Sequence, residues 1–523
     1  LQSNEICDDG NQSSGDYCAS NCLTETGSCG AATQQANEAC DDGNTADGDY
    51  CSSDCMTITG SCGDGTIQTN EECDDSNSRT DMCPYGQQSC TVCGASCQNT
   101  AGVPNYCGDG TNVAQEECDE GSANSSDPFA TCTDVCEQNI APVQVSAGYS
   151  HTCAVLNTGR IKCWGWDCSY QTGVSLSVTR IGSCRQVESP EYVPNITDAV
   201  EVRAGSAHTC ALHSTGEISC WGSNQYGQFG NGQWDTSTLS QHTVSSISDA
   251  VSISAGAYFT CAIVANGNVY CWGRNNYLQT GSSSNETCRL GVSCSTTPKK
   301  VVLPTAATAV SSSNSRHACA LDASGDVHCW GQNTVGQIGI GTGSQTSGPV
   351  RVSGLPHGLE VSTGGGFTLM SSTGGDMYGW GGDGTGQLAE APTSDTCSSS
   401  PCSLSPTALP QPSNVSQFDA GSGHSCAFDG TEILCWGKER SGQLGDDQSP
   451  VGWYSSNGWR DEPVGVFNGP TGVHDISLGG SHSCVIDSTD ASLWCWGSDE
   501  HSQLGISTTQ TCQTGVSDYI DCA

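Results

Sequence analysis

Cysteine is the residue type whose number and spacing in this chain most clearly indicate chemistry, because the sequence has 37 of them in 523 residues. In the segment HTCALHSTGEISCWG, Cys210 and Cys220 flank the loop 214–216, which ends in the glycine that a left-handed turn position requires. Folding about Thr215 places the two cysteines opposite each other, at a separation that a disulfide spans in a non-hydrogen-bonded pair. The segment therefore predicts a hairpin of two half-buried strands with its own crosslink.

The same cysteine pairing recurs along the chain. Six of seven segments have facing cysteines, and four of the seven loops that follow the segments have a further pair. A seventh segment has Leu369 and Gly379 at both positions, and this joint loss is what a paired role predicts. The predicted hairpin disulfides are Cys153 with Cys163, Cys210 with Cys220, Cys261 with Cys271, Cys319 with Cys329, Cys426 with Cys435, and Cys484 with Cys495. The predicted loop disulfides are Cys168 with Cys184, Cys288 with Cys294, Cys397 with Cys402, and Cys512 with Cys522.

Clusters of aspartate and asparagine near the N-terminus are candidate calcium ligands. Calcium takes six to eight oxygen ligands and tolerates irregular loops. The spacing is not that of an EF-hand, however, and the same residues are ordinary turn formers, so calcium binding and simple turns both stay open. Zinc fits less well because residues 1–138 contain no histidine and their cysteines suit disulfides better. The candidates are Asp8, Asp9, Asn11, Asp16, Asp41, Asp42, Asn44, Asp49, Asp74, Asp75, Asn77 and Asp81.

Histidine recurs at one position of the repeated segment, as His151, His208, His317, His424 and His482. A ring of metal ligands is conceivable on the pattern alone. Phe259 and Phe367 occupy the same position in two segments, which favours packing.

Three aromatic residues, Trp453, Tyr454 and Trp459, lie in the long insertion QSPVGWYSSNGWRDEP, which has no cysteine. Exposed aromatic side chains on a loop suit a glycan or protein contact. Packing of the loop on itself is the alternative.

Five asparagines begin an N-x-Ser/Thr sequence and are candidate glycosylation sites on loops. They are Asn11, Asn124, Asn195, Asn285 and Asn414.

Catalytic motifs are missing from the sequence. It has no Gly-x-Ser-x-Gly elbow, no phosphate-binding glycine loop and no His-Glu-x-x-His zinc motif. The carboxylates are numerous, but no pair departs from the turn pattern. We therefore expect a protein that is not an enzyme.

The hairpins that position these cysteines belong to a repeat. A Trp-Gly step occurs at Trp164, Trp221, Trp272, Trp330, Trp380, Trp436 and Trp496, and each is followed by a glutamine at a similar offset. Successive tryptophans are 57, 51, 58, 50, 56 and 60 residues apart, which is typical of propeller blades with loop insertions. Seven units of about four short strands predict an all-β fold, a closed seven-bladed β-propeller over residues 139–523.

Units such as AGSAHTCALHSTGEISCWGSNQYGQFGNG resemble the repeats of the regulator of chromosome condensation family. The resemblance covers residues 140–523 and implies a seven-bladed propeller. The functions found in that family include nucleotide exchange on a small GTPase, accessory domains of ubiquitin ligases and a secreted β-lactamase inhibitor. Fold therefore does not settle function here.

Residues 1–138 form a second region with 17 cysteines and too few aromatic residues for a hydrophobic core. The spacing in CGAATQQANEACDDGNTADGDYCSSDC recurs, and with CGDGTIQTNEECDDSN it resembles the myxobacterial-type cysteine-rich repeat of secreted and surface proteins. We expect four such repeats with little secondary structure. In the first, Cys7, Cys18 and Cys22 match Cys40, Cys51 and Cys55, but the counterpart of Cys29 would precede Leu1. A trimmed N-terminus, or a segment or thiol from a neighbouring subunit, would explain this.

Charge and cysteine content limit the possible partners and compartments. The formal net charge is −41, and there are only 15 lysines and arginines, so no basic patch predicts nucleic-acid binding. Abundant paired cysteines indicate an oxidising compartment. No apolar run approaches the ~20 residues that span a bilayer.

These observations together predict an extracellular protein, secreted or attached to the cell surface, that binds proteins or glycans. One hypothesis is a structural or adhesive role, as the repeating subunit of a filament that assembles through the N-terminal repeats. The alternative is a secreted inhibitor or ligand-binding propeller that acts as a soluble monomer.

Overall fold

The computed structural model describes residues 39, 56, 62–65, 67, 71–83, 87–105, 140–175, 178–181, 184–234, 237–389, 395–397, 399–446, 458–505 and 520–521. The chain divides into two compact units, residues 1–138 and residues 139–523. Strands and turns make up the described residues, which contain one 3-10 turn, η2 (Arg289–Gly291), and no α-helix. Nothing helical in this part of the chain has the length and apolar character that a bilayer-spanning helix needs.

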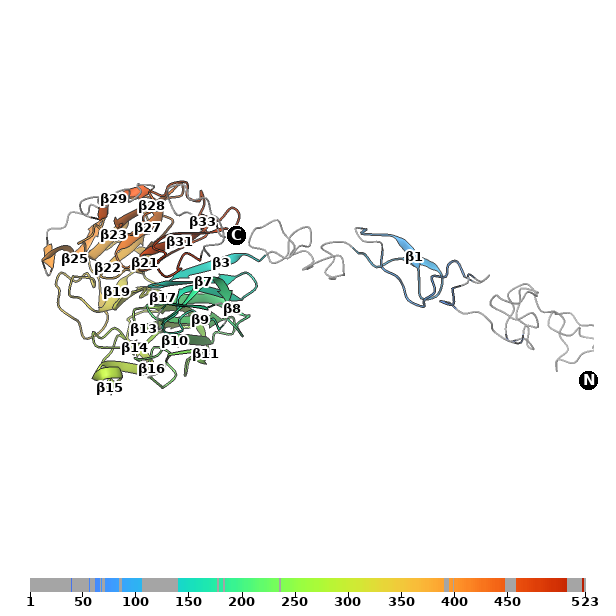
Figure 1. Ribbon diagram of the computed structural model, residues 1–523, viewed down its shortest axis with the longest axis horizontal. Helices are drawn as coiled ribbons and strands as arrows, with labels where there is room; N and C mark the ends of the chain where they lie inside the picture. Colours follow the sequence, from blue (N-terminus) through green and yellow to red (C-terminus); the bar gives the residue numbers. More distant parts are fainter. Residues whose placement is uncertain are drawn as a thin grey trace, which may run out of the picture. The chain divides into compact units, whose positions relative to one another are not determined.

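The second unit is an all-β, seven-bladed propeller, as the sequence predicts (Figure 1). Blade 1 contains β3 (Pro142–Ala147), β4 (His151–Leu156), β5 (Ile161–Trp166), β7 (Cys184–Tyr192) and β6 (Val178–Ile181). Blade 2 contains β8 (Ala199–Ala204), β9 (His208–His213), β10 (Ile218–Ser223) and β11 (Ser237–Thr243). Blade 3 contains β12 (Ala250–Ala255), β13 (Phe259–Val264), β14 (Val269–Arg274), β16 (Ser293–Val301) and β15 (Glu286–Thr287).

Blade 4 contains β17 (Ala307–Ser311), β18 (His317–Asp322), β19 (Val327–Gly331) and β20 (Val350–Arg351). Blade 5 contains β21 (Gly358–Thr363), β22 (Phe367–Ser372), β23 (Met377–Gly382), β25 (Ser400–Ala408) and β24 (Asp395–Cys397). Blade 6 contains β26 (Gln417–Ala420), β27 (His424–Phe428), β28 (Ile433–Lys438) and β29 (Trp459–Gly465). Blade 7 contains β30 (Asp475–Leu478), β31 (His482–Ile486), β32 (Leu493–Gly497) and β33 (Ile520–Asp521).

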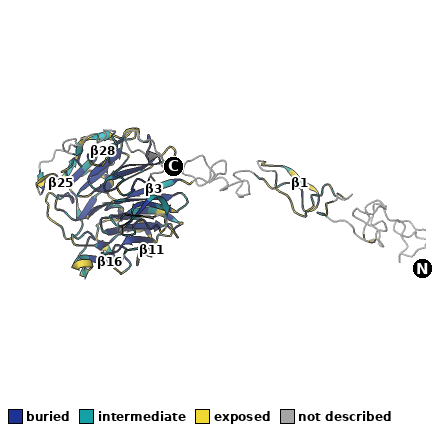
Figure 2. Cartoon of the chain, viewed as in Figure 1, coloured by how far each residue is buried: buried dark blue, intermediate teal, exposed yellow. Residues whose placement is uncertain are grey.

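The hairpin register matches the sequence prediction, but its burial does not. Leu212 pairs with Ile218 and Cys210 with Cys220, and Gly216 has a φ of +84°, in the left-handed region that the turn needs. The expectation of half-buried strands is wrong, because β9 and β10 are buried on both faces (Figure 2). A central strand of a blade is covered by one neighbouring blade on each side, so alternation along the strand does not separate core from solvent.

The hydrophobic core is divided into clusters, each shared by two adjacent blades. The Trp-Gly tryptophan of one blade packs with the hairpin disulfide of the preceding blade, as Trp272 does with Cys210 and Cys220. In blade 5, where both cysteines are absent, Leu369 and Leu388 fill this space and pack with Trp436 of blade 6. A Cβ atom on Gly379 would lie 2.9 Å from Leu388, so the glycine makes room for the leucines.

A hydrogen bond from tryptophan to a glutamine carbonyl joins each pair of blades. The indole Nε1 of Trp221 donates to the backbone oxygen of Gln171 in blade 1, and the same bond occurs at all seven blade interfaces, at 2.8–3.0 Å. Each glutamine side chain accepts from the backbone N–H two residues before it, which holds its loop in place. The spacing of tryptophan and glutamine in the sequence therefore encodes contacts between blades.

The recurring histidines complete this link. His208 Nε2 lies 3.0 Å from Thr260 Oγ1 of the next blade, and that hydroxyl donates to the Gln228 backbone oxygen. Because the hydroxyl has only one hydrogen, the histidine must be the donor. His151, His317, His424 and His482 contact Thr209, Thr368, Ser483 and Thr152 in the same way.

Ring closure uses the same contacts and exchanges no strand between blades. Thr152 of blade 1 bonds both His482 and the Gln503 carbonyl of blade 7, and Trp164 also donates to Gln503. The C-terminal strand β33 pairs with β32 as the outer strand of blade 7.

We expect the histidine and threonine of this contact to be energetically coupled in their contribution to the stability of the fold. T260V should lower stability by about 1–2 kcal/mol, because it removes a buried hydroxyl with two partners. The double variant H208F/T260A copies the pair that the chain already has in blades 3 and 4, Phe259 and Ala318. It should cost less than the sum of H208F and T260A in chemical denaturation, and strict additivity would contradict the pairing.

Candidate functional site

The propeller cysteines lie as predicted wherever they fall within the described residues. All six hairpin pairs are joined by disulfides, which are Cys153 with Cys163, Cys210 with Cys220, Cys261 with Cys271, Cys319 with Cys329, Cys426 with Cys435, and Cys484 with Cys495. Three loop pairs are also joined, which are Cys168 with Cys184, Cys288 with Cys294, and Cys397 with Cys402. The fourth loop pair, Cys512 with Cys522, lies outside the described residues and stays a prediction.

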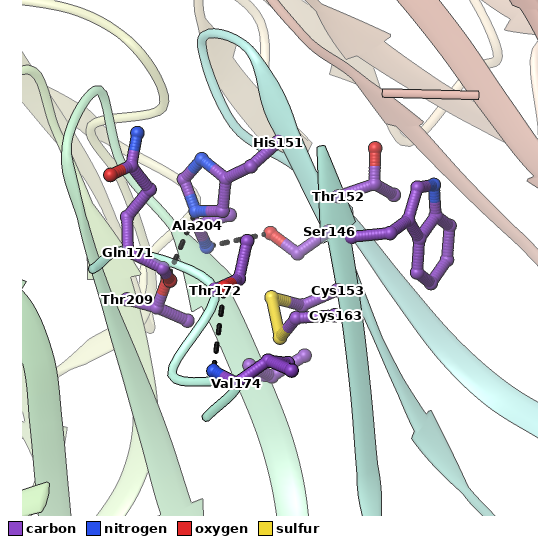
Figure 3. The surroundings of a disulfide bond; sticks show 12 residues. Ser146, His151, Thr152, Cys153, Cys163, Gln171, Thr172, Val174, Ala204 and Thr209 are labelled. Atoms are coloured by element: carbon purple, nitrogen blue, oxygen red, sulfur yellow. Dashed lines mark hydrogen bonds between the residues drawn. A yellow bond between two sulfur atoms is a disulfide. The ribbon is translucent and has the colours of Figure 1, made fainter. Parts of the chain in front are cut away.

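The hairpin disulfides have the geometry that the register requires. Their Cα–Cα distances are 4.1 or 4.2 Å, close to the spacing of a non-hydrogen-bonded pair. Figure 3 shows the Cys153–Cys163 disulfide beside the contacts that His151 and Ser146 make with the next blade. The crosslink within a blade therefore lies next to the contacts between blades.

The described part of the N-terminal unit shows three disulfides that are nested in the sequence, Cys62–Cys97, Cys73–Cys93 and Cys83–Cys90. Two short strands, β1 (Thr91–Cys93) and β2 (Asn99–Ala101), pair with each other. Sequence spacing left this connectivity open. A group of three possible metal ligands, Cys62, Glu71 and Cys97, occurs among the described residues, but its two cysteines are bonded to each other.

The one described aspartate cluster forms turns. Asp74 accepts hydrogen bonds from the backbone N–H groups of Gly63, Gly65 and Ser76, at 2.7–3.2 Å. Asp75 accepts from the Asn77 N–H, and the Asn77 amide contacts Asp81. The turn interpretation therefore accounts for much of this loop, and calcium stays a prediction. The equivalent residues from Asp8 to Asp49 lie outside the described residues.

The predicted surface residues divide between described and undescribed segments. Asn195, Asn285 and Asn414 are exposed, whereas Asn11 and Asn124 lie outside the described residues. Trp459 begins β29, pairs with Lys438 and is half-buried. Trp453 and Tyr454 also lie outside the described residues.

A ring of side chains on the inner strands forms an arrangement that the sequence analysis missed. One residue per blade accepts a hydrogen bond from the backbone N–H of the next inner strand, at 2.8–3.1 Å in six interfaces. The acceptors are Ser146, Ser254, Ser311, Ser362, Asp419 and Ser477. Arg203 holds the equivalent place in blade 2, where it cannot accept and pairs with Glu201 at 2.7 Å. Glu201 also accepts from Ile253 N–H, as Gln144 does from Val202 N–H one blade earlier.

Four carboxylates and one guanidinium gather around this ring, which we name the axial charge cluster: Glu201, Arg203, Glu360, Asp419 and Asp475. Glu360 is exposed at the surface of the ring, but the surrounding protein displaces part of its water and, with the charges of Asp419 and Asp475, raises its pKa to about 7. Burial likewise raises the pKa of Asp475 to about 6. Burial opposes the charge on Arg203, but the surrounding carboxylates outweigh it and raise the guanidinium pKa. The residues of the axial charge cluster share no sequence motif. Their positions on the inner strands are the only feature of the sequence from which the cluster could have been predicted.

The recurring histidines are uncharged and take part in structural contacts. Burial lowers the pKa of His208 and of His317 to about 3, so both are neutral at physiological pH. Their Nε2 atoms are used in the blade contacts, and their Nδ1 atoms have no hydrogen-bond partner among the described residues. A packing role accounts for them, as the phenylalanine replacements suggest.

Comparison with known proteins identifies the repeat. The RCC1-like domain family matches residues 87–427, and the regulator of chromosome condensation (RCC1) repeat matches residues 473–503. The ultraviolet-B receptor UVR8 of Arabidopsis thaliana is 27% identical over 316 residues, which cover 59% of this chain and 67% of that protein. The probable E3 ubiquitin-protein ligase HERC4 of Homo sapiens is 29% identical over 224 residues, 41% of this chain and 20% of the ligase.

Solved structures show the same fold at lower identity. Yeast RCC1 (Prp20) bound to Kap60 superposes with a TM-score of 0.54 at 20% identity, over 64% of this chain and 78% of that chain. Human WBSCR16 superposes with a TM-score of 0.52 at 20% identity, over 65% and 85% of the two chains.

The raised pKa of Glu360 predicts a stability change with pH. A carboxyl whose folded pKa lies above its unfolded value favours folding below the unfolded pKa, and this contribution is lost as pH rises through about 7. E360Q should therefore raise the melting temperature relative to wild type at pH 8 and change it little at pH 5. The matched control E217Q, at an exposed hairpin residue, should show no such difference. An equal effect of E360Q at both pH values would contradict the assignment.

Proposed function

Because the chain belongs to the RCC1-like domain family, we propose that it is an extracellular protein-binding scaffold without catalytic activity. The observation that carries this proposal is the buried cross-strand disulfide in six of the seven blades. Cytosolic thiols are kept reduced, whereas disulfides persist in secreted and surface proteins. Each closed hairpin loop is expected to contribute about 2–4 kcal/mol of stability.

Protein binding is the activity that the family likeness supports. A solved structure has yeast RCC1 bound to Kap60, and another concerns the binding of Prp20p to Gsp1p and histones. Those structures are 20% and 19% identical to this chain, so they support the fold and the idea of a binding platform, not those partners. Nucleic acid fits this chain poorly as a partner, because binding to phosphates favours a basic protein and this one has a net charge of −41.

A non-catalytic role also fits the way the carboxylates are used. Asp419 and Asp475 accept backbone hydrogen bonds between blades, and Glu201 pairs with Arg203. These groups therefore serve the ring itself. The matched ubiquitin ligase is five times longer than the segment that the chain matches, which leaves ligase activity without support here.

Within this role, a structural or adhesive subunit of an extracellular filament is our first version. A rigid propeller preceded by crosslinked acidic repeats suits a load-bearing subunit, because covalent links within blades and hydrogen bonds between them resist local unfolding. The second version is a secreted inhibitor or ligand-binding propeller, for which a monomeric state and one dominant binding face would be expected.

Electron microscopy of the purified full-length protein separates the two versions. A filament subunit should form end-to-end chains whose length increases with concentration. Monodisperse single propellers up to high micromolar concentration would contradict the filament and support the inhibitor.

Alkylation of the native protein tests the compartment. We expect no labelling of the hairpin cysteines by iodoacetamide under non-reducing conditions, and complete labelling after reduction in denaturant, as read by mass spectrometry. Reactive thiols at Cys210 and Cys220 in native material would contradict the extracellular proposal, whatever the state of assembly.

A further inference from the structure

One surface of the propeller differs from the rest in its chemistry. It is formed at one end of blades 2, 3 and 4 by the loop after β10, the loop between β12 and β13, the end of β14, the turn η2 and the loop between β17 and β18. We name it the arginine–tyrosine surface and define it by Tyr226, Tyr258, Arg274, Arg289 and Arg316. No sequence motif marked it, because its members come from three repeats.

The centre of this surface is an aromatic pair under a guanidinium. The Tyr226 and Tyr258 rings meet edge to face with centroids 5.4 Å apart. Arg274 Cζ lies 5.1 Å from the Tyr226 ring centroid and 5.7 Å from that of Tyr258. All three side chains are half-buried, so they are held in place and still accessible.

Hydrogen bonds connect the flanking arginines to this centre. Arg289 donates to the side chain of Gln225, the residue next to Tyr226. On the other side, Ala257 N–H donates to the Ser315 backbone oxygen at 2.8 Å, which places Arg316 beside the Tyr258 loop. Arg289 and Arg316 are exposed, and Leu290 next to Arg289 is 88% exposed.

The three arginines of this surface have no acidic partner among the described residues, in contrast to four other arginines of the propeller. Arg185, Arg203, Arg351 and Arg460 each lie within 3.1 Å of a carboxylate. In the described part of the chain, no ion pair forms at Arg274, Arg289 or Arg316, and the Arg274 Nε is buried without a hydrogen-bond partner. Unpaired positive charge is unexpected in a chain with 56 acidic residues and 15 basic ones.

We propose that the arginine–tyrosine surface binds the acidic N-terminal unit of a second copy of this chain. Arginine and tyrosine dominate the energetics of protein interfaces, and arginine binds carboxylates in a two-point geometry. The complementary surface is in the same protein, since residues 1–138 have 25 acidic residues against the single base Arg79. This inference rests on the filament version of the proposed function and gives it a head-to-tail contact, which propagates instead of closing into a dimer.

Sedimentation velocity of the full-length protein in 50 mM and 500 mM NaCl tests the contact. We expect wild-type protein to self-associate at low salt and to dissociate as salt screens the charges. R274E/R316E should weaken association at least tenfold. R289E changes an exposed side chain that hydrogen-bonds Gln225, and it should weaken association severalfold with the fold retained. K300E makes the same charge change at an exposed site in blade 3 and should have no effect.

The outcomes distinguish this contact from the broader function. Salt-sensitive association that survives both R274E/R316E and R289E, with melting temperatures near wild type, would overturn the surface and leave the filament standing. A monomer at every salt concentration would overturn both the surface and the filament, whereas the alkylation result for the scaffold would be unaffected. Heparin binding that depends on Arg274 and Arg316, without self-association, would assign the surface to an anionic glycan and overturn the proposal.

Discussion

The link between neighbouring blades is the contact on which the propeller depends. At each interface one glutamine carbonyl accepts the tryptophan indole of the next blade, and at six of the seven it also accepts a hydroxyl. A buried carbonyl has two lone pairs, so two donors satisfy the glutamine carbonyl fully at these six interfaces. Because the junction of blades 7 and 1 uses the same atoms, the ring closes without any exchange of strands.

Covalent and non-covalent links have separate places in this structure. Disulfides join the second and third strands within a blade, and hydrogen bonds and tryptophan packing join blades to one another. The covalent and non-covalent links meet where the tryptophan of one blade packs on the hairpin disulfide of the preceding blade. In blade 5 leucines fill the place of the missing cysteines beside Trp436. Filling the space next to the tryptophan therefore matters as much as the disulfide bond itself. A scaffold built in this way keeps its outer loops free for binding.

Acidic and basic side chains also have separate places in this protein. The acidic side chains of the axial charge cluster contribute to the ring of inner strands, and Arg185, Arg351 and Arg460 each pair with a nearby carboxylate. The arginine–tyrosine surface gathers three arginines without such a partner, and its charge is opposite to that of the strongly acidic N-terminal unit. Assembly between copies would bring these two charges together without altering either fold.

Local spacing in the sequence was enough for the strands, the blade count and the hairpin crosslinks, because a hairpin brings together residues about ten positions apart. The sequence also shows two paired absences. Cysteine is missing from both facing positions of one hairpin, at Leu369 and Gly379. A histidine and its hydroxyl partner are missing together one repeat apart, at Phe259 and Ala318. Other features depended on the closed ring. Thr152 meets His482 across 330 residues, and Glu360, Asp419 and Asp475 converge from three blades. No short-range pattern encodes such meetings, because they arise only when seven separate sheets are packed side by side and every face is covered.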